Sequence, residues 1–87
     1  MHIQKAKIVK YLVVEVETED KVYIIDFNKT RHHEFDILKE DKDYFYNNFN
    51  YNIWMIYWDD STDLSIDELE YYSKGDIILL GYLKKNG

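Results

Sequence analysis

The chain has no cysteine and no proline, and only three of its 87 residues are glycine. The lack of cysteine excludes a disulfide framework, a thiolate zinc site and a cysteine nucleophile. Long hydrophobic runs are missing too, because three lysines interrupt the first ten residues, so we expect neither a signal peptide nor a membrane-spanning segment. These absences favour a cytoplasmic protein.

Aromatic side chains are the abundant component. The chain holds nine Tyr, four Phe and two Trp, and 46% of its residues are hydrophobic. A disordered chain would be poor in these residue types. The length is that of one small globular domain, so residues 1–87 are expected to form a single domain.

Charge is unevenly distributed along the chain. Of the eleven basic residues, five lie at the two ends: Lys5, Lys7, Lys10, Lys84 and Lys85. Residues 11–83 contain the other six basic residues and all seventeen acidic residues, so their formal charge is −11. A body this acidic repels phosphate backbones, which argues against direct binding of nucleic acid.

Hydrophobic alternation predicts four strands, over residues 6–17, 22–27, 51–58 and 77–83. The polar residues 18–21 separate the first two strands, so these are expected to form a β-hairpin. From Ile53 onward the third strand is apolar on both parities, which predicts a central strand covered on both faces.

Two helices are expected. Ser65-Ile-Asp-Glu68 has the pattern of a capping box and predicts a helix over residues 65–74, with a buried stripe and Gly75 at its end. The stripe comprises Ile66, Leu69 and either Tyr71 or Tyr72. A shorter helix begins at Asp41 or Asp43 and runs to about Asn48.

The polar stretch before the short helix is the least regular part of the sequence. We expect Phe35, Ile37 and Leu38 to dock residues 28–41 onto the sheet. The predicted fold is therefore α+β: a small mixed or antiparallel sheet of about four strands, the helix 65–74, and the short helix packed on it.

Three segments together carry a resemblance to a known family. They are Val22-Tyr-Ile-Ile-Asp-Phe27, then Leu38-Lys-Glu-Asp41 with Phe45, then Trp58-Asp-Asp-Ser-Thr-Asp-Leu64 with Leu69 and Tyr71. On these segments, residues 11–71 resemble the small bacterial domain family DUF 2442. The family usually has glycine in the first hairpin and glycine or a small polar residue before its Asp-Leu pair. This chain has Thr18–Lys21 and Asp59–Thr62 there, and its last strand lies outside the family pattern.

The resemblance implies a partner-binding module. Members of the family are often encoded beside a second small protein, in pairs of the toxin–antitoxin type, and the family pattern contains no catalytic residues. It therefore implies a non-enzymatic, antitoxin-like protein without a cofactor.

Two local patterns resemble metal sites. Asp59-Asp-Ser-Thr-Asp63 has the spelling of a magnesium–diphosphate motif, but that chemistry needs facing helices, so we interpret it as a solvated turn before the helix cap. Weak binding of a hard cation there stays open. His32 and His33 are adjacent, would point to opposite faces of a strand, and have no third ligand nearby, so no metal site is predicted.

Enzymatic activity is not expected either. The sequence has no nucleophile elbow and no glycine-rich oxyanion loop, and nothing among its many carboxylates singles out a catalytic pair.

The main functional hypothesis is a protein–protein interface. It combines surplus aromatic side chains with acidic residues of the turn and helix, namely Asp59, Asp60, Asp63, Asp67, Glu70 and Tyr71. The alternative is a small acidic inhibitor of the phage anti-defence type, which mimics nucleic acid and blocks a nucleic-acid-binding enzyme. A third hypothesis is a small-molecule site between the helices and sheet of a dimer. Edge strands without proline favour pairing into a homodimer.

Overall fold

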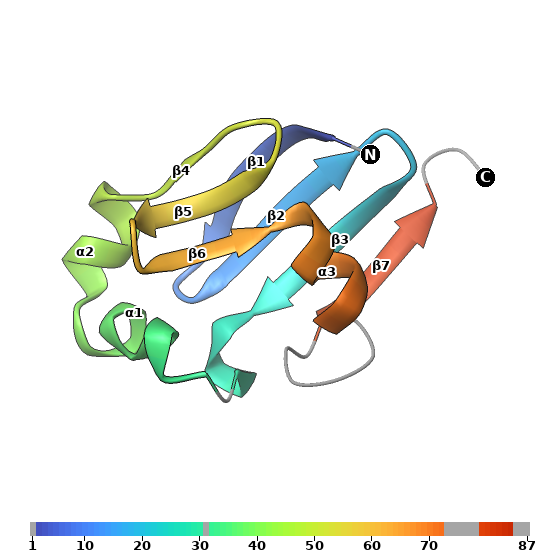
Figure 1. Cartoon of the computed structure of the whole chain (residues 1–87). Helices are drawn as coiled ribbons and strands as arrows, with labels where there is room; N and C mark the ends of the chain where they lie inside the picture. Colours follow the sequence, from blue (N-terminus) through green and yellow to red (C-terminus); the bar gives the residue numbers. More distant parts are fainter. Residues whose placement is uncertain (1, 31, 73–78, 85–87) are drawn as a thin grey trace.

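The computed structural model describes residues 2–30, 32–72 and 79–84, with side chains through Leu69. Two antiparallel sheets form the framework (Figure 1). The first has the order β1 (Ile3–Lys10), β2 (Val13–Thr18), β3 (Lys21–Asp26) and β7 (Leu79–Lys84). The second has the order β4 (Asn50–Tyr51), β5 (Met55–Asp59) and β6 (Thr62–Ser65). The predicted α+β class is confirmed, but a single sheet of about four strands is wrong.

Helical segments join and flank the two sheets. Between β3 and β4 they are η1 (Phe27–Lys29), η2 (His33–Phe35), α1 (Asp36–Glu40) and α2 (Lys42–Asn47), and α3 (Ile66–Tyr72) follows β6. Figure 1 shows α1 and α2 at one end of the sheets and α3 toward the other. The prediction that the short helix packs on the helix 65–74 is therefore wrong, because the second sheet lies between α2 and α3 along the chain and separates them. None of the helices in the described part of the chain is long and apolar enough to cross a membrane.

The strand predicted over residues 6–17 is wrong, because the chain reverses at Tyr11 and Leu12 and forms the β1–β2 hairpin. Leu12 has a positive φ of 67°. A leucine in that left-handed conformation costs roughly 1–2 kcal/mol. Two tertiary contacts offset the cost: the Leu12 side chain is buried, and its carbonyl accepts a hydrogen bond from Phe27 N at 2.8 Å. Glycine or asparagine, the usual mark of such a turn, is absent.

The second hairpin confirms its prediction. Residues 19 and 20 connect β2 to β3, and Thr18 Oγ1 accepts hydrogen bonds from the backbone N–H of Asp20 at 3.3 Å and of Lys21 at 3.1 Å. The Thr18 side chain thus stabilises a turn that contains no glycine. Phe27, predicted to end the strand, begins η1 instead.

The strand predicted over residues 51–58 is also wrong, because it is interrupted by a turn. The Asn52 side chain accepts hydrogen bonds from Trp54 N at 2.8 Å and Met55 N at 3.0 Å. This is an Asx turn, in which the side chain stands in for a backbone acceptor. Ile53 and Trp54 therefore lie at an exposed hairpin tip and not in a covered central strand.

The acidic segment that follows turns back into a further strand before the helix starts. β6 pairs with β5, so the turn lies within a hairpin and not directly at the helix cap. The capping box is confirmed, since Ser65 N donates to Glu68 Oε1 at 2.9 Å and Glu68 N donates to Ser65 Oγ at 3.2 Å. The predicted helix end at 73–74, Gly75 and the first residues of the strand 77–83 lie outside the described residues.

The connection between the sheets contains one predicted and one unexpected helix. Asp41 caps α2, because its Oδ1 accepts a hydrogen bond from Tyr44 N at 3.0 Å, as predicted. Helix α1 was not predicted. Phe35 and Leu38 are fully buried, as expected, whereas Ile37 is exposed and that part of the prediction is wrong.

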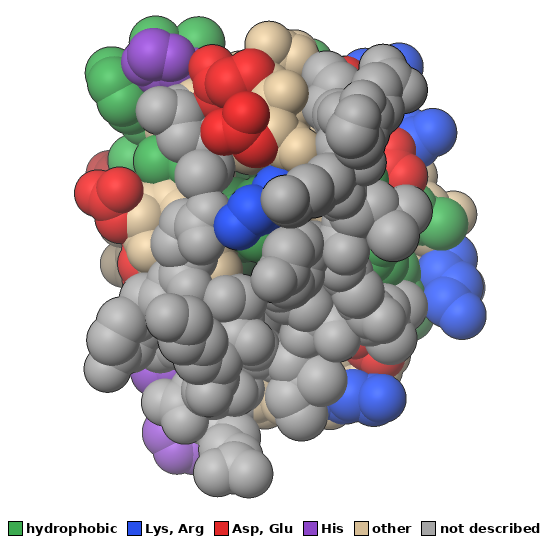
Figure 2. Space-filling view, turned by 90° about the vertical axis from the view of Figure 1, so that its right-hand side faces the viewer, with side chains coloured by type: hydrophobic (Ala, Val, Ile, Leu, Met, Phe, Trp, Pro, Cys, Tyr) green, Lys and Arg blue, Asp and Glu red, His purple; other side chains and the backbone are tan. Residues whose placement is uncertain are grey.

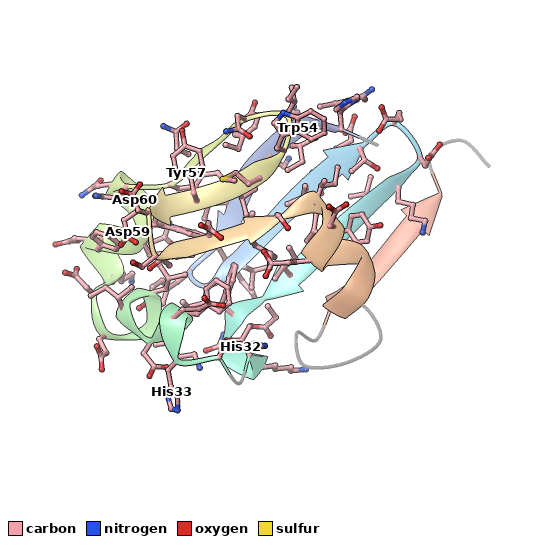
Figure 3. The ribbon with its side chains drawn as sticks, viewed as in Figure 1. His32, His33, Trp54, Tyr57, Asp59 and Asp60 are labelled. Atoms are coloured by element: carbon pink, nitrogen blue, oxygen red, sulfur yellow. The ribbon has the colours of Figure 1, made fainter. Side chains whose placement is uncertain are left out.

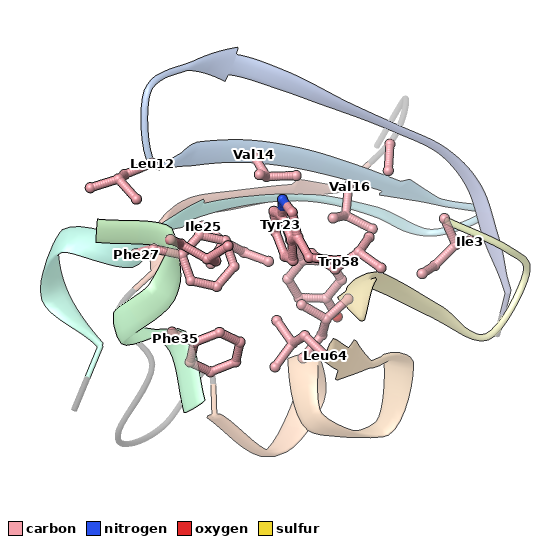
Figure 4. Packing of buried hydrophobic residues seen from close by; sticks show 14 of the residues in the cluster. Ile3, Leu12, Val14, Val16, Tyr23, Ile25, Phe27, Phe35, Trp58 and Leu64 are labelled. Atoms are coloured by element: carbon pink, nitrogen blue, oxygen red, sulfur yellow. The ribbon is translucent and has the colours of Figure 1, made fainter. Parts of the chain in front are cut away.

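The core lies between the two sheets. Inward side chains of the first sheet meet those of the second sheet and of the helical connection (Figure 4): Val14, Val16, Tyr23, Ile25, Phe27, Phe35, Trp58 and Leu64. Ile56 of β5 belongs to the same cluster. Trp58 joins the sheet to α2, because its Nε1–H donates to the Phe45 carbonyl at 2.9 Å. The opposite face of β4-β5-β6 carries no described element in front of it (Figure 1).

Candidate interaction surface

The outward side chains of β5 and β6 define the surface of interest, here called the outer face. Along β5, Ile56 and Trp58 point into the core, so the alternate residues Met55 and Tyr57 point outward. Both are partly exposed, and Tyr57 lies opposite Asp63 in the β5–β6 register. An antiparallel sheet commonly packs one face on the core and leaves the other to solvent. Here the solvent face carries two large side chains, and no described element covers it.

A concavity of about 340 Å³ opens on the outer face. It is lined by Asn52, Met55, Tyr57, Asp59, Asp60 and Asp63. A thioether and a phenol thus lie among three carboxylates and one amide. The hydrogen bonds of Asn52 that form the Asx turn also fix one wall of this concavity.

The carboxylates of the concavity differ in their environment. Tyr44 Oη donates a hydrogen bond to Asp59 Oδ2, and Ser61 N donates to Asp59 Oδ1 at 2.8 Å. These bonds favour the ionised form, so the pKa of Asp59 is lowered, while the pKa of Tyr44 is raised to about 12. Asp59 is therefore a fixed negative charge at the rim.

Asp63 has the opposite shift. Partial burial raises its pKa, and the negative charges of Glu68, Asp59 and Asp60 raise it further. Among the residues that the structure describes, no lysine or arginine forms an ion pair with these carboxylates. The concavity thus holds negative charge that its described surroundings leave unbalanced.

An apolar tip lies at the other end of β5. The Ile53 side chain is 51% exposed and the Trp54 side chain is 53% exposed. The backbone carbonyls of both residues nevertheless accept hydrogen bonds from neighbouring elements. Ile3 N donates to the Ile53 carbonyl at 2.9 Å, and Ile66 N donates to the Trp54 carbonyl at 2.8 Å. The His2 ring packs edge-on against the Trp54 indole, with centroids 4.8 Å apart. In Figure 2 a histidine side chain lies against hydrophobic side chains at the upper edge of the molecule.

The tip and the acidic end are parts of one surface. Figure 3 shows Trp54 at one end of the three-stranded sheet, Asp59 and Asp60 at the other, and Tyr57 between them. At about 3.3 Å per residue in a strand, Trp54 and Asp59 are roughly 16 Å apart. A segment lying along β5 would contact both.

The structure brings together some of the predicted site residues and separates others. Asp59, Asp60 and Asp63 line one concavity. Asp67 is exposed on α3, which starts at the end of β6 remote from the acidic turn, and does not line the concavity. Glu70 and Tyr71 belong to α3, but their side chains lie outside the described part.

Sequence reasoning missed the residues that complete this surface, namely Asn52, Met55 and Tyr57. The sequence signal for Met55 and Tyr57 is that they alternate along the strand with Asp59 and so lie on the same face as that carboxylate. That face was predicted to be covered because it is apolar over most of its length.

In the part of the chain that the structure describes, the adjacent histidines His32 and His33 do not lie near other possible metal ligands that would complete a site with them. His33 Nδ1 lies 3.1 Å from Asp36 Oδ2 and is exposed, while the His32 ring packs edge-on near Phe35. In the described ranges no group of three His, Cys, Asp or Glu side chains is placed to hold a metal ion. This includes Asp59, Asp60 and Asp63, so the structure gives no support to cation binding by their joint coordination.

No family model, no curated protein and no solved structure matches this chain. The resemblance of residues 11–71 to DUF 2442 therefore stays a prediction from the residues that carry it.

Proposed function

We propose that this protein is a non-enzymatic protein-binding module, of the kind that neutralises a partner as an antitoxin does. Its interface would be the outer face together with the apolar tip. The observation that carries the proposal is the exposure of two large hydrophobic side chains, Ile53 and Trp54, on a loop held by hydrogen bonds. Tryptophan is one of the residues enriched among the side chains that dominate binding energy at interfaces.

The rigidity of the tip supports this use. Binding loses less free energy to ordering when the contacting loop already has one conformation. Asn52 fixes the turn from within, while Ile3 and Ile66 hold its backbone from neighbouring elements. Two exposed apolar side chains on a loop held in this way can contact a partner without further ordering of the loop.

The acidic end of the surface supports steering of the partner. Negative charge at Asp59, Asp60 and Asp63 speeds the encounter with a basic protein surface and disfavours acidic partners. The concavity lies on a sheet face and not between helices and sheet, so the described residues give less support to the small-molecule hypothesis than to this one.

We retain a second proposal, in which the same acidic end mimics nucleic acid and blocks a nucleic-acid-binding enzyme. Its support is the gathering of three aspartates without an ion-pair partner among the described residues. An interface of this kind depends on charge, so its affinity falls steeply with salt and free nucleic acid competes for the partner.

The test is capture of partners on the tagged full chain from lysate of its native cell, at low and high salt, with mass spectrometry of retained proteins. Trp54→Ala is compared with Val9→Ala, which removes a side chain of the same 53% exposure from β1. We expect wild type to capture one protein in stoichiometric amount, which stays bound at high salt, and we expect Val9→Ala to capture the same protein. Trp54→Ala should weaken its binding about 30-fold or more, the effect of a hot-spot residue.

Charge reversal separates steering from contact. Asp60→Lys leaves the hydrogen bonds of Asp59 in place and should slow association more than it speeds dissociation. A partner held equally by wild type and Trp54→Ala would refute the apolar tip as interface. A nucleic-acid enzyme that is lost at high salt and displaced by DNA or RNA would favour the second proposal instead.

A further inference from the structure

The three aspartates of the concavity are spread around its rim. They line one depression of about 340 Å³, yet no three of the acidic or histidine side chains in the described part are placed around a single ion. A compact divalent cation needs oxygens at about 2–2.6 Å from one point. A cation that contacts all three carboxylates would therefore have to be larger than a metal ion and carry donors that point in several directions.

A guanidinium group has these properties. It is planar, presents five N–H donors in a fixed fork, stacks on aromatic rings and is more weakly hydrated than an ammonium group. The concavity offers carboxylates at Asp59, Asp60 and Asp63, with the Tyr57 ring and Met55 beside them. We propose that this concavity receives an arginine side chain of the protein partner, from an extended segment that lies along β5.

Charge argues for a cation at this place. Asp63 is partly buried beside two other carboxylates, and the side-chain carboxylates of Asp60 and Asp63 form no hydrogen bond or ion pair with a described residue. Like charges held together in a partly desolvated place repel each other, and an incoming cation relieves that repulsion. Asp59 is already fixed by Tyr44 and Ser61, so it adds charge to the site without having to be ordered.

The length of the surface defines the partner further. The apolar tip and Asp59 at the acidic end lie about 16 Å apart along β5, which corresponds to about five residues of extended chain. The partner segment should therefore carry a large apolar residue for Trp54 and Ile53, and an arginine four or five residues from it. This inference rests on the proposed function, because it assigns the partner's chemistry to the same surface.

The test is a titration of the full-length protein, followed by amide NMR, with blocked peptides that have leucine and arginine four or five residues apart. The control peptide carries citrulline, which has the shape of arginine without its charge. We expect saturable shifts at Tyr57, Asp60 and Asp63 with the arginine peptide, and at least ten-fold weaker binding of the citrulline peptide. Lysine in place of arginine should bind less well than arginine.

Protein variants complete the test. Asp63→Asn should weaken binding of the arginine peptide several-fold, while Asp20→Asn, an exposed acid in the β2–β3 turn, should leave it unchanged. Equal binding of the arginine and citrulline peptides, or an Asp63→Asn variant that binds as wild type does, would overturn the inference.

The two proposals fail differently. If Trp54→Ala abolishes capture of the partner but no arginine peptide binds, the protein-binding module stands and the arginine site is refuted. If the arginine peptide binds at the concavity while capture is insensitive to Trp54→Ala, the arginine site stands and the apolar tip is refuted as interface.

Discussion

Replacing Trp58 by phenylalanine should destabilise the fold strongly. The indole is 4% exposed, packs against Phe27, Phe45 and Phe49 at centroid distances of 5.3–5.6 Å, and donates its N–H to the Phe45 carbonyl. Loss of that donor leaves a buried carbonyl without its partner, at about 1–3 kcal/mol. The smaller ring also leaves a void that costs about 1 kcal/mol.

Together these effects predict a loss of about 2–4 kcal/mol in the free energy of unfolding. For a chain of this size that is a large fraction of the total, and it should lower the melting temperature by about 10 °C or more. The loss in the free energy of unfolding is measured by urea denaturation followed by far-UV circular dichroism. Fluorescence is unsuitable because the substitution removes one of the two tryptophans that would report unfolding.

The chain offers its own control. Trp54→Phe makes the same chemical change at a side chain that is half exposed, so it should alter the free energy of unfolding by no more than about 0.5 kcal/mol. Equal losses for the two variants, or a loss below about 0.5 kcal/mol for Trp58→Phe, would refute the reasoning that Trp58 ties α2 to the second sheet.

Three further predictions follow from local contacts. Ser65→Ala removes the acceptor of the capping box and should cost about 1 kcal/mol in urea denaturation. Asn52→Ala should speed hydrogen exchange at the amides of Trp54 and Met55, which its side chain holds. Because the pKa of Asp63 is raised, its contribution to stability is complete below the unfolded-state pKa and is lost as pH rises through the folded-state pKa. Asp63→Asn should therefore unfold at higher urea than wild type at pH 7, and this advantage should vanish below about pH 4.

Features that depend on residues close in sequence were predictable. The capping box joins Ser65 to Glu68, and Asp41 caps α2 through Tyr44 N, so each contact spans three residues. The β2–β3 turn is likewise closed by Thr18 over residues 19–21. Both partners of such a contact lie within a few residues of each other, which is why the sequence pattern alone identifies it.

The turns that were missed depend on distant residues. Nothing between Lys10 and Val13 marks a reversal, and Leu12 takes its positive φ because the core buries its side chain and Phe27 N bonds its carbonyl. The break at Asn52 is closed partly by its own side chain, yet the surrounding apolar run conceals it. Hydrophobic alternation by itself therefore merged β1 with β2 and β4 with β5.

The candidate site divides in the same way. The sequence by itself determined the acidic cluster, since Asp59, Asp60 and Asp63 lie within five residues of one another. Only the tertiary structure decided that Tyr57 and Met55 face outward beside them and that Trp54 stands at an exposed tip. The two faces of an apolar strand look alike in sequence, and packing of the first sheet against Ile56 and Trp58 decides which of them is left open.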